Sequence, residues 1–276
     1  MTINCKGQLV DLSSPKVMGI LNVTPDSFYD GGAYKNEKTI LGQVEKMLNE
    51  GASFVDIGAY SSRPGADFVS EAEELKRILP IVKSILNKFP NTLLSIDTFR
   101  STVAKQCIEA GAALVNDISA GKLDENMLPT LANLQVPYIM MHMRGTPQTM
   151  QQHTHYNNLV KDILFYFSER IAAATALGII DVIIDPGFGF AKTLEQNFEL
   201  LNQLELFNMI EKPLLVGVSR KSMIYKALNT SAQEALNGTT VLNTVALQKG
   251  ASILRVHDVK EAMECIKLVE QLEVRS

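Results

Sequence analysis

Eight short apolar runs recur along the chain, and each run ends in a polar residue that is followed by a loop and then by a helical pattern. Most of the runs are apolar at consecutive positions rather than at alternate ones. This continuity is expected of strands in a parallel sheet whose two faces are both covered. The runs occupy residues 17–22, 54–56, 93–97, 114–117, 138–142, 182–185, 214–219 and 253–257.

The stretches between the runs carry apolar residues at helical spacing, and the last of them predicts a terminal helix over residues 259–272. Thr193 and Gln196 have the spacing of a capping box, which predicts that a helix begins there. Pro80 falls inside a helical pattern over residues 71–89. Because proline lacks a backbone N–H, we expect a kink or a break at this point.

Eight strand–helix units in 276 residues predict a single α/β domain over residues 1–276, folded as a (β/α)8 TIM barrel. An open doubly wound sheet is the alternative, but no glycine-rich dinucleotide fingerprint follows the first run. Two domains would also fit the length, yet no linker-like stretch divides the chain. Residues 1–11 precede the first run, and we expect this short N-terminal extension to cap the lower end of the barrel, with a hairpin as one form.

The charge balance limits the partners of the chain. Lys and Arg number 26 against 30 Asp and Glu, a formal net charge of −4, so we expect no general binding to nucleic acid and only a local anion site. No run approaches the roughly 18 apolar residues of a membrane span, and the N-terminus lacks the pattern of a signal peptide. Cys5, Cys107 and Cys265 lack paired spacing, which is typical of a reducing compartment. We therefore expect a cytoplasmic protein without a membrane partner.

The last residue of each run is a candidate site residue, because chemistry in such a barrel lies at the C-terminal ends of the strands. A single Asp at this position is often only a helix cap or a turn residue. All eight runs end in polar residues, however, which predicts one shared site. These residues are Asn22, Asp56, Asp97, Asn116 with Asp117, His142, Asp185, Ser219, and Arg255 with His257.

Two loops above the expected mouth carry further candidates. Residues 22–32 (NVTPDSFYDGG) include Phe28 and two glycines, and they are either an ordinary surface loop or a lid that folds over substrate. Residues 61–66 (SSRPGA) combine two hydroxyls with Arg63. These groups suit an anion clamp, although a Pro-Gly pair alone indicates only a turn.

Two later segments carry groups suited to a flat, charged ligand. In residues 185–192 (DPGFGFAK), glycines allow close backbone approach, and Phe188 and Phe190 can line a flat ring. Lys221 in the segment SRKS is a Schiff-base nucleophile, a hydrogen-bond donor or a solvated surface lysine. Ser222 begins a helix, where it either meets a carboxylate or serves as a cap.

No set of residues has the spacing of a permanent metal site. Asn22 together with a phosphate oxygen can still hold Mg²⁺, which keeps several waters and takes few protein ligands.

The order of the motifs resembles dihydropteroate synthase over nearly the whole chain. The motifs are NVTPDSF, DIGxxSxRPG, SIDT, NDI, MHM, DPGFGF, SRKS and RVHD. The resemblance implies that 6-hydroxymethyl-7,8-dihydropterin pyrophosphate and 4-aminobenzoate are condensed to 7,8-dihydropteroate with release of pyrophosphate. It also implies a dissociative mechanism, a place in folate biosynthesis, inhibition by sulfonamides and a homodimer.

The resemblance assigns roles to residues that match the motifs. The implied pterin-binding residues are Asp97, Asn116, Asp185, Lys221 and Arg255. The implied pyrophosphate-binding residues are Asn22, which would hold Mg²⁺, together with Ser62, Arg63, Arg255 and His257. The implied aminobenzoate-binding residues are Phe28, Ser62, Arg63, Pro64, Phe190, Lys221 and Ser222. The implied catalytic residues are Asp97, Lys221, Arg255 and His257.

The chain departs from the usual family pattern at five positions. Ala59, Tyr60 and Ser62 replace a glycine, a smaller or acidic residue, and a threonine. Arg144 replaces a common glutamine, and Ala191 replaces a common glycine. The first group bears on the fit of the aminobenzoate and sulfonamide pocket rather than on the reaction.

Other functions remain as alternatives. A pterin-binding domain that passes the methyl group of methyltetrahydrofolate to a corrinoid would share the Asp and Asn residues, but it does not need the anion-binding groups of SxRPG and RVHD. An aldolase would use Lys221 as a Schiff base. A non-catalytic pterin-binding subunit would bind ligand without turnover.

Overall fold

The computed structural model describes residues 1–23, 33–60 and 69–273. The predictions for Phe28, Ser62, Arg63 and Pro64 lie outside the described residues. Among the described ranges, no helix combines the length and the apolar composition that a membrane crossing requires.

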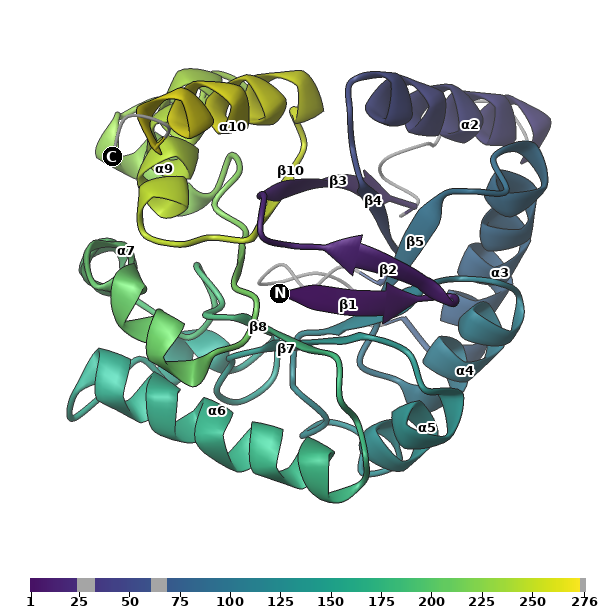
Figure 1. Ribbon diagram of the computed structural model, residues 1–276, viewed down its shortest axis with the longest axis horizontal. Helices are drawn as coiled ribbons and strands as arrows, with labels where there is room; N and C mark the ends of the chain where they lie inside the picture. Colours follow the sequence, from purple (N-terminus) through teal and green to yellow (C-terminus); the bar gives the residue numbers. More distant parts are fainter. Residues whose placement is uncertain (24–32, 61–68, 274–276) are drawn as a thin grey trace.

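In the part of the chain that the structure describes, eight parallel strands form one central sheet with helices around it (Figure 1). The strand order is β8-β7-β6-β5-β4-β3-β10-β9. A further parallel bridge joins Ile184 of β8 to Leu214, next to β9, and closes the sheet. The strands are β3 (Lys16–Asn22), β4 (Phe54–Gly58), β5 (Leu93–Asp97), β6 (Leu114–Asp117), β7 (Tyr138–Met141), β8 (Val182–Asp185), β9 (Leu215–Val216) and β10 (Ile253–Val256). The predicted (β/α)8 barrel is confirmed, and the open doubly wound sheet is wrong.

The helices follow the strands along the chain and pack on the outside of the sheet (Figure 1). Thr193 and Gln196 form the predicted capping box, with both reciprocal hydrogen bonds. The α-helices are α2 (Ala33–Asn49), α3 (Glu71–Lys88), α4 (Ser101–Glu109), α5 (Met127–Leu134), α6 (Leu159–Ala176), α7 (Leu194–Asn202), α8 (Ser222–Ala227), α9 (Leu236–Gln248) and α10 (Val259–Glu273). Two 3₁₀ turns, η1 (Met150–Gln152) and η2 (Leu204–Ile210), lie between them.

The observed elements differ from the predicted ones most clearly at Pro80 and at β9, while β4 extends two residues past the predicted run 54–56. Helix α3 continues through Pro80, so it has no break there; Pro80 is exposed, while Ile78 and Val82 on the inner face are buried and hold the helix on the core. Strand β9 is shorter than the predicted run over 214–219, because the chain turns after Gly217: the Lys221 amide donates to the Val218 carbonyl, and Arg220 has a φ of 52°.

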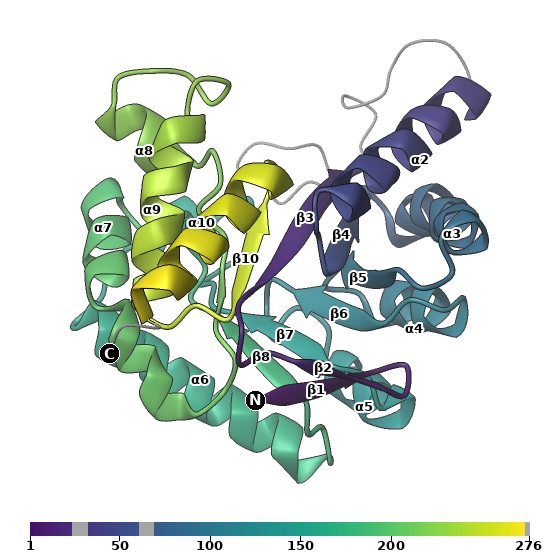
Figure 2. The ribbon, with the colours of Figure 1, turned by 45° about the horizontal axis from the view of Figure 1, so that its top comes forward.

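The N-terminal extension is a hairpin of β1 (Thr2–Cys5) and β2 (Gln8–Asp11). Lys6 and Gly7 both have positive φ angles, 57° and 80°, as a two-residue hairpin turn of this kind requires. The hairpin lies across one end of the barrel (Figure 2), where Ile3 and Cys5 pack in one apolar cluster with residues that begin the strands, such as Phe54. The predicted cap on the lower end is thus confirmed, and the opposite end carries the polar residues.

Candidate active site

Arg255 on β10 bridges two carboxylates that come from two other strands. Its Nε donates to Oδ2 of Asp56 on β4 at 2.6 Å, and its Nη2 donates to Oδ2 of Asp97, the last residue of β5, at 2.8 Å. Hydrogen bonds between ionised partners are stronger than neutral ones, and a guanidinium is suited to contact two acceptors in fixed directions. The bridge shows that β4, β5 and β10 bring these three side chains together, although only Asp97 is the last residue of its strand.

Asp56 is the hub of this arrangement, although the sequence assigned it no role beyond its place at a strand end. Its side chain is 1% exposed, and the same Oδ2 accepts a hydrogen bond from Asn116 Nδ2 at 3.1 Å. Its Oδ1 is buried and has no hydrogen-bond partner among the described residues. Asp56 therefore orients two predicted pterin-binding residues, Asn116 and Arg255, and retains one free acceptor.

Burial affects both predicted pterin-binding carboxylates. It raises the pKa of Asp97, and the nearby Asp56 adds to this effect while Arg255 opposes it. Burial also raises the pKa of Asp185, against the charge of Lys221 and the Gly187 amide, which donates to Asp185 Oδ1 at 2.8 Å. A ligand that donates N–H groups to these carboxylates would therefore stabilise their charged forms.

Lys221 lies at the end of the β9 segment and is one of the groups facing these carboxylates. Its Nζ donates to the Phe188 carbonyl at 2.5 Å and lies 5.0 Å from the centroid of the Phe190 ring. Burial lowers the pKa of Lys221 to about 8, with Arg255 acting in the same direction and Asp185 and Asp97 opposing it. Lys221 is half-buried and its Nζ already donates to a backbone carbonyl, which favours the hydrogen-bond donor over a solvated surface lysine.

The ends of β9 and β10 are joined at two points. Ser219 Oγ accepts from the His257 amide at 3.2 Å and lies 3.1 Å from His257 Nδ1. Arg220 donates from Nε and Nη2 to the two oxygens of Asp258 at 2.8 and 2.9 Å. Because Arg220 precedes Lys221 and Asp258 follows His257, this ion pair fixes the spacing between the SRKS and RVHD segments.

Two strand-end residues do not join the site. Asp117 accepts hydrogen bonds from the Ser119 amide and hydroxyl, the Gly121 amide and the Tyr138 hydroxyl, at 2.6 to 2.8 Å. His142 is 1% exposed; its Nδ1 lies 3.1 Å from Lys192 Nζ, and its ring packs edge-on against Tyr166. These two residues stabilise the loops after β6 and β7.

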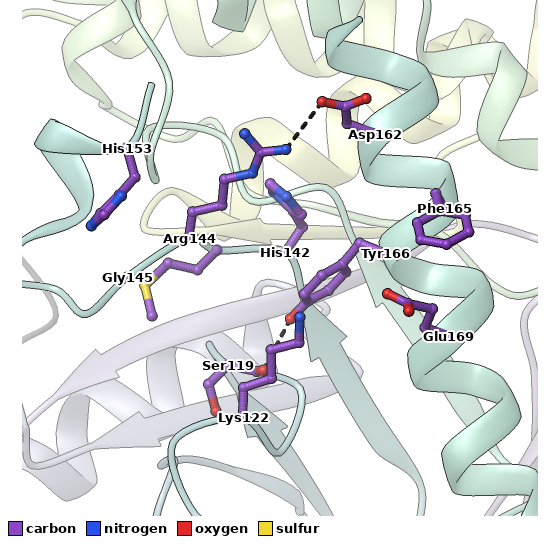
Figure 3. A pocket seen from close by; sticks show the side chains of 11 residues that line it. Ser119, Lys122, His142, Arg144, Gly145, His153, Asp162, Phe165, Tyr166 and Glu169 are labelled. Carbon is purple, nitrogen blue, oxygen red and sulfur yellow. Dashed lines mark hydrogen bonds and ion pairs between the residues drawn. The ribbon is translucent and has the colours of Figure 1, made fainter. Parts of the chain in front are cut away.

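A cavity of about 440 Å³ is lined by residues from the segments after β6 and β7 and from α6 (Figure 3). Arg144 is one of the lining residues. Its Nη2 donates to Asp162 Oδ2 at 3.1 Å, and its Cζ lies 3.8 Å from the centroid of the Tyr156 ring. These contacts accommodate the arginine that replaces the common glutamine. Of the candidate site residues, His142 lines this cavity, but none of the described residues to which the resemblance assigns a binding or catalytic role does. The convergence of strand ends, and not the size of a cavity, identifies the candidate active site.

Asn22, Phe190 and Ser222 lie around the same mouth. Asn22 ends β3 in register with Gly58 of β4, and Ser222 begins α8; all three side chains are half-buried. In the described ranges, no group of three His, Cys, Asp or Glu residues is arranged to hold a metal. An amide oxygen from Asn22 fits Mg²⁺, which binds through few protein ligands together with substrate phosphates and water.

Comparison with known proteins gives the family of this fold and site. The family profile described as "Pterin binding enzyme" matches residues 18–257. The dihydropteroate synthase of Escherichia coli is 42% identical over 272 residues, which cover 98% of this chain and 96% of that protein.

Solved structures agree with the sequence comparison. The dihydropteroate synthase of Yersinia pestis, in a complex with a sulfonamide drug, superposes with a TM-score of 0.93 at 42% identity, covering 99% of this chain and 100% of that one. The Xanthomonas albilineans enzyme with 4-aminobenzoic acid gives a TM-score of 0.91 at 35% identity, covering 99% and 98%. The chain therefore belongs to the dihydropteroate synthase family of pterin-binding transferases, which act in folate biosynthesis.

Proposed function

We propose that this chain condenses 6-hydroxymethyl-7,8-dihydropterin pyrophosphate with 4-aminobenzoate to give 7,8-dihydropteroate and pyrophosphate. The observation that carries the proposal is the bridge from Arg255 to Asp56 and Asp97. A ligand with a donor-rich ring and an anionic tail needs carboxylates and a cation in one mouth, and the bridge supplies both.

The pterin ring is bound by the carboxylates and amide of the mouth. A carboxylate accepts two parallel N–H bonds from an aminopyrimidine edge, which suits Asp185 and Asp97, while Asn116 and Lys221 serve the carbonyl and the ring nitrogens. Arg255 stacks on the pterin face. Asn116 and Asp185 are each only 5% exposed. This burial supports their role in binding the pterin, because the polar edge of a buried ring needs hydrogen-bond partners that are themselves buried.

The reaction begins with cleavage of the C–O bond to pyrophosphate, whose oxygen takes the electron pair. The remaining pterin methylene cation is attacked by the amino nitrogen of 4-aminobenzoate, which then loses a proton. Asp97 stabilises the cation, while Arg255 and His257 meet the charge that develops on the leaving group. Both signs of charge are needed in one mouth because both develop in the same step.

Mg²⁺ is the proposed metal, and Asn22 at the end of β3 is the residue that would hold it. When bound, Mg²⁺ would neutralise charge on the phosphate oxygens. His257 lies at the end of β10, the strand paired with β3, so it would approach the same pyrophosphate.

The proposed aminobenzoate pocket includes Phe190, Lys221 and Ser222. In support, Phe190 and Lys221 are already in contact through the ring face. The remaining members, Phe28, Ser62, Arg63 and Pro64, lie outside the described residues.

Residues 1–276 are proposed to form a single pterin-binding domain, since one sheet contains all eight parallel strands. The cytoplasmic location stays a prediction; it agrees with Cys5, Cys107 and Cys265, which are free and buried.

We also propose a homodimer. Val241 on α9, and Leu268 and Leu272 on the adjoining α10, are 52%, 70% and 64% exposed. Exposed apolar side chains on neighbouring helices fit an interface between two copies. Light scattering should give twice the 30.4 kDa mass of the chain, and a monomer mass would contradict the proposal.

Pyrophosphate release by the purified protein tests the reaction, with both substrates present and with Mg²⁺ either supplied or removed by a chelator. Release that requires the pterin ester and Mg²⁺ is expected. The methyltransferase alternative predicts methyl transfer from methyltetrahydrofolate to a corrinoid instead. Tight pterin binding without pyrophosphate release would refute the synthase proposal.

A further inference from the structure

Lys192 is a buried lysine that the proposed reaction does not use. It is 3% exposed and lies just before α7. Its Nζ donates to the carbonyls of Gly187 and Phe190 at 2.9 and 3.0 Å, and it lies 3.1 Å from His142 Nδ1. A lysine ammonium has three N–H donors, and these three contacts use all of them.

These contacts join the 187–190 turn to the end of β7. A Cβ atom on Gly187 would lie 2.1 Å from the His142 carbonyl oxygen, and Gly187 has a φ of 71°, so the two backbones pack too closely for any other residue. Burial and the charge of Lys192 hold the pKa of His142 well below its usual value, which keeps the ring neutral. Nδ1 of a neutral ring is available as an acceptor for Lys192.

Both protonation states of Lys192 preserve the attachment. Burial lowers the pKa of Lys192 to about 7, although the charge of Asp185 opposes this. The uncharged amine still has two N–H donors for the Gly187 and Phe190 carbonyls, and its lone pair can accept from the His142 ring. The attachment of the turn therefore does not depend on one charge state.

The turn that Lys192 holds contacts the site at three points. The Phe188 carbonyl accepts from Lys221 Nζ at 2.5 Å, and the Phe190 ring lies 5.0 Å from the same atom. The Gly187 amide donates to Asp185 Oδ1 at 2.8 Å. The turn thereby sets the positions of one cation and one carboxylate in the mouth.

We infer that Lys192 is a positioning residue: by fixing the 187–190 turn against β7, it places Lys221 and Asp185 for the pterin and Phe190 for 4-aminobenzoate. The inference rests on the proposed function for the identity of these ligands. The part that concerns Lys221 and Asp185 does not rest on turnover, because binding of the pterin ester can be measured by itself.

The variant Lys192→Met tests the inference, since it keeps most of the side-chain length and removes all three hydrogen bonds. We expect weaker binding of 6-hydroxymethyl-7,8-dihydropterin pyrophosphate by calorimetry and a higher KM for 4-aminobenzoate, each by about tenfold, as for the loss of a hydrogen bond to a charged group. The exposed Lys161 provides the control Lys161→Met, which should change neither constant.

Measuring KM and kcat separately distinguishes a positioning role of Lys192 from a role in protein stability alone. A purely structural lysine would lower the fraction of folded enzyme, so the apparent kcat would fall while KM and Kd stayed the same. Unchanged Kd and KM in a folded Lys192→Met protein, checked by circular dichroism, would overturn the inference. A wild-type protein that binds both ligands without turnover would instead refute the proposed function, and the Kd comparison would still test Lys192.

A second variant keeps the test open if Lys192→Met does not fold. His142→Leu removes the third partner of the amine, together with the edge-on ring contact to Tyr166, and leaves the Gly187 and Phe190 carbonyls in place. It should raise the same two constants by a smaller factor, about threefold, as for a weaker neutral hydrogen bond. Wild-type constants in folded His142→Leu would count against the inference.

Discussion

Arg255 donates a hydrogen bond of 2.6 Å to Asp56 across 199 positions of sequence, and this contact organises the mouth of the barrel. Asp56 is buried, so its charge is stabilised by the guanidinium and by the Asn116 amide rather than by water. The relationship makes Asp56 a positioning residue for two groups that meet the pterin.

The first prediction concerns Asp56→Asn, which keeps the shape of the side chain and removes its charge. Arg255 would lose one of its two anionic partners, so kcat/KM should fall by at least about a hundredfold, equivalent to the roughly 3 kcal/mol that breaking a buried pair costs. Steady-state pyrophosphate release measures this. The exposed Glu125 offers the control Glu125→Gln, and equal activity of the two variants would show that Asp56 does not organise the site.

The second prediction concerns pH. The pKa of Lys221 is lowered to about 8, so its ammonium loses a proton as pH rises through that value. Because the neutral amine is no longer a cation for the ligand, kcat/KM should fall with rising pH on the alkaline side of about 8. In Lys221→Arg, which stays charged, this limb should disappear from the pH profile. The same limb in both proteins would assign it to another group.

The third prediction concerns the ion pair between Arg220 and Asp258, which joins the segments carrying Lys221 and His257. A double-mutant cycle of Arg220→Met and Asp258→Asn should give a coupling energy of about 1–2 kcal/mol, since the pair is bidentate and partly buried. Chemical denaturation provides the free energies of unfolding. Strictly additive effects would mean that the pair contributes no stability of its own.

The fourth prediction separates stability from activity at the two ends of the barrel. Ile3 in the hairpin is 2% exposed, so Ile3→Ala should lower the free energy of unfolding by about 2–5 kcal/mol. At a temperature where the variant is folded, kcat/KM should match wild type, because the hairpin lies opposite the mouth. Loss of activity in the folded variant would indicate coupling between the ends.

The elements of the barrel could be predicted because short, continuous apolar runs are typical of buried parallel strands, and here they alternate with helical patterns. The length of β9 could not, since the apolar character of residues 214–218 continues past the point where the backbone turns at Gly217. Likewise, Pro80 interrupts a local pattern, but the packing of Ile78 and Val82 preserves the helix around it.

The site was predicted in part for a related reason. Asn116 and Asp117 are adjacent in a strand and therefore point to opposite sides, and only Asn116 joins Asp56. The role of Asp56 depends on its contact with Arg255, which is 199 positions away in the sequence, and the sequence pattern does not reveal this contact. Lys192 follows a loop, where lysines are ordinarily exposed, and only its three partners in the fold explain its burial.

The most direct test of the central claim compares the affinities of two ligands, 6-hydroxymethyl-7,8-dihydropterin and its pyrophosphate ester, for wild type and for Arg255→Gln. The comparison isolates the pyrophosphate, because both ligands contain the same ring. We predict that wild type prefers the ester in the presence of Mg²⁺, and that Arg255→Gln loses at least about tenfold of this preference, as expected for a charge-assisted contact. An undiminished preference in Arg255→Gln would contradict the account in which Arg255, held by Asp56 and Asp97, serves the leaving group.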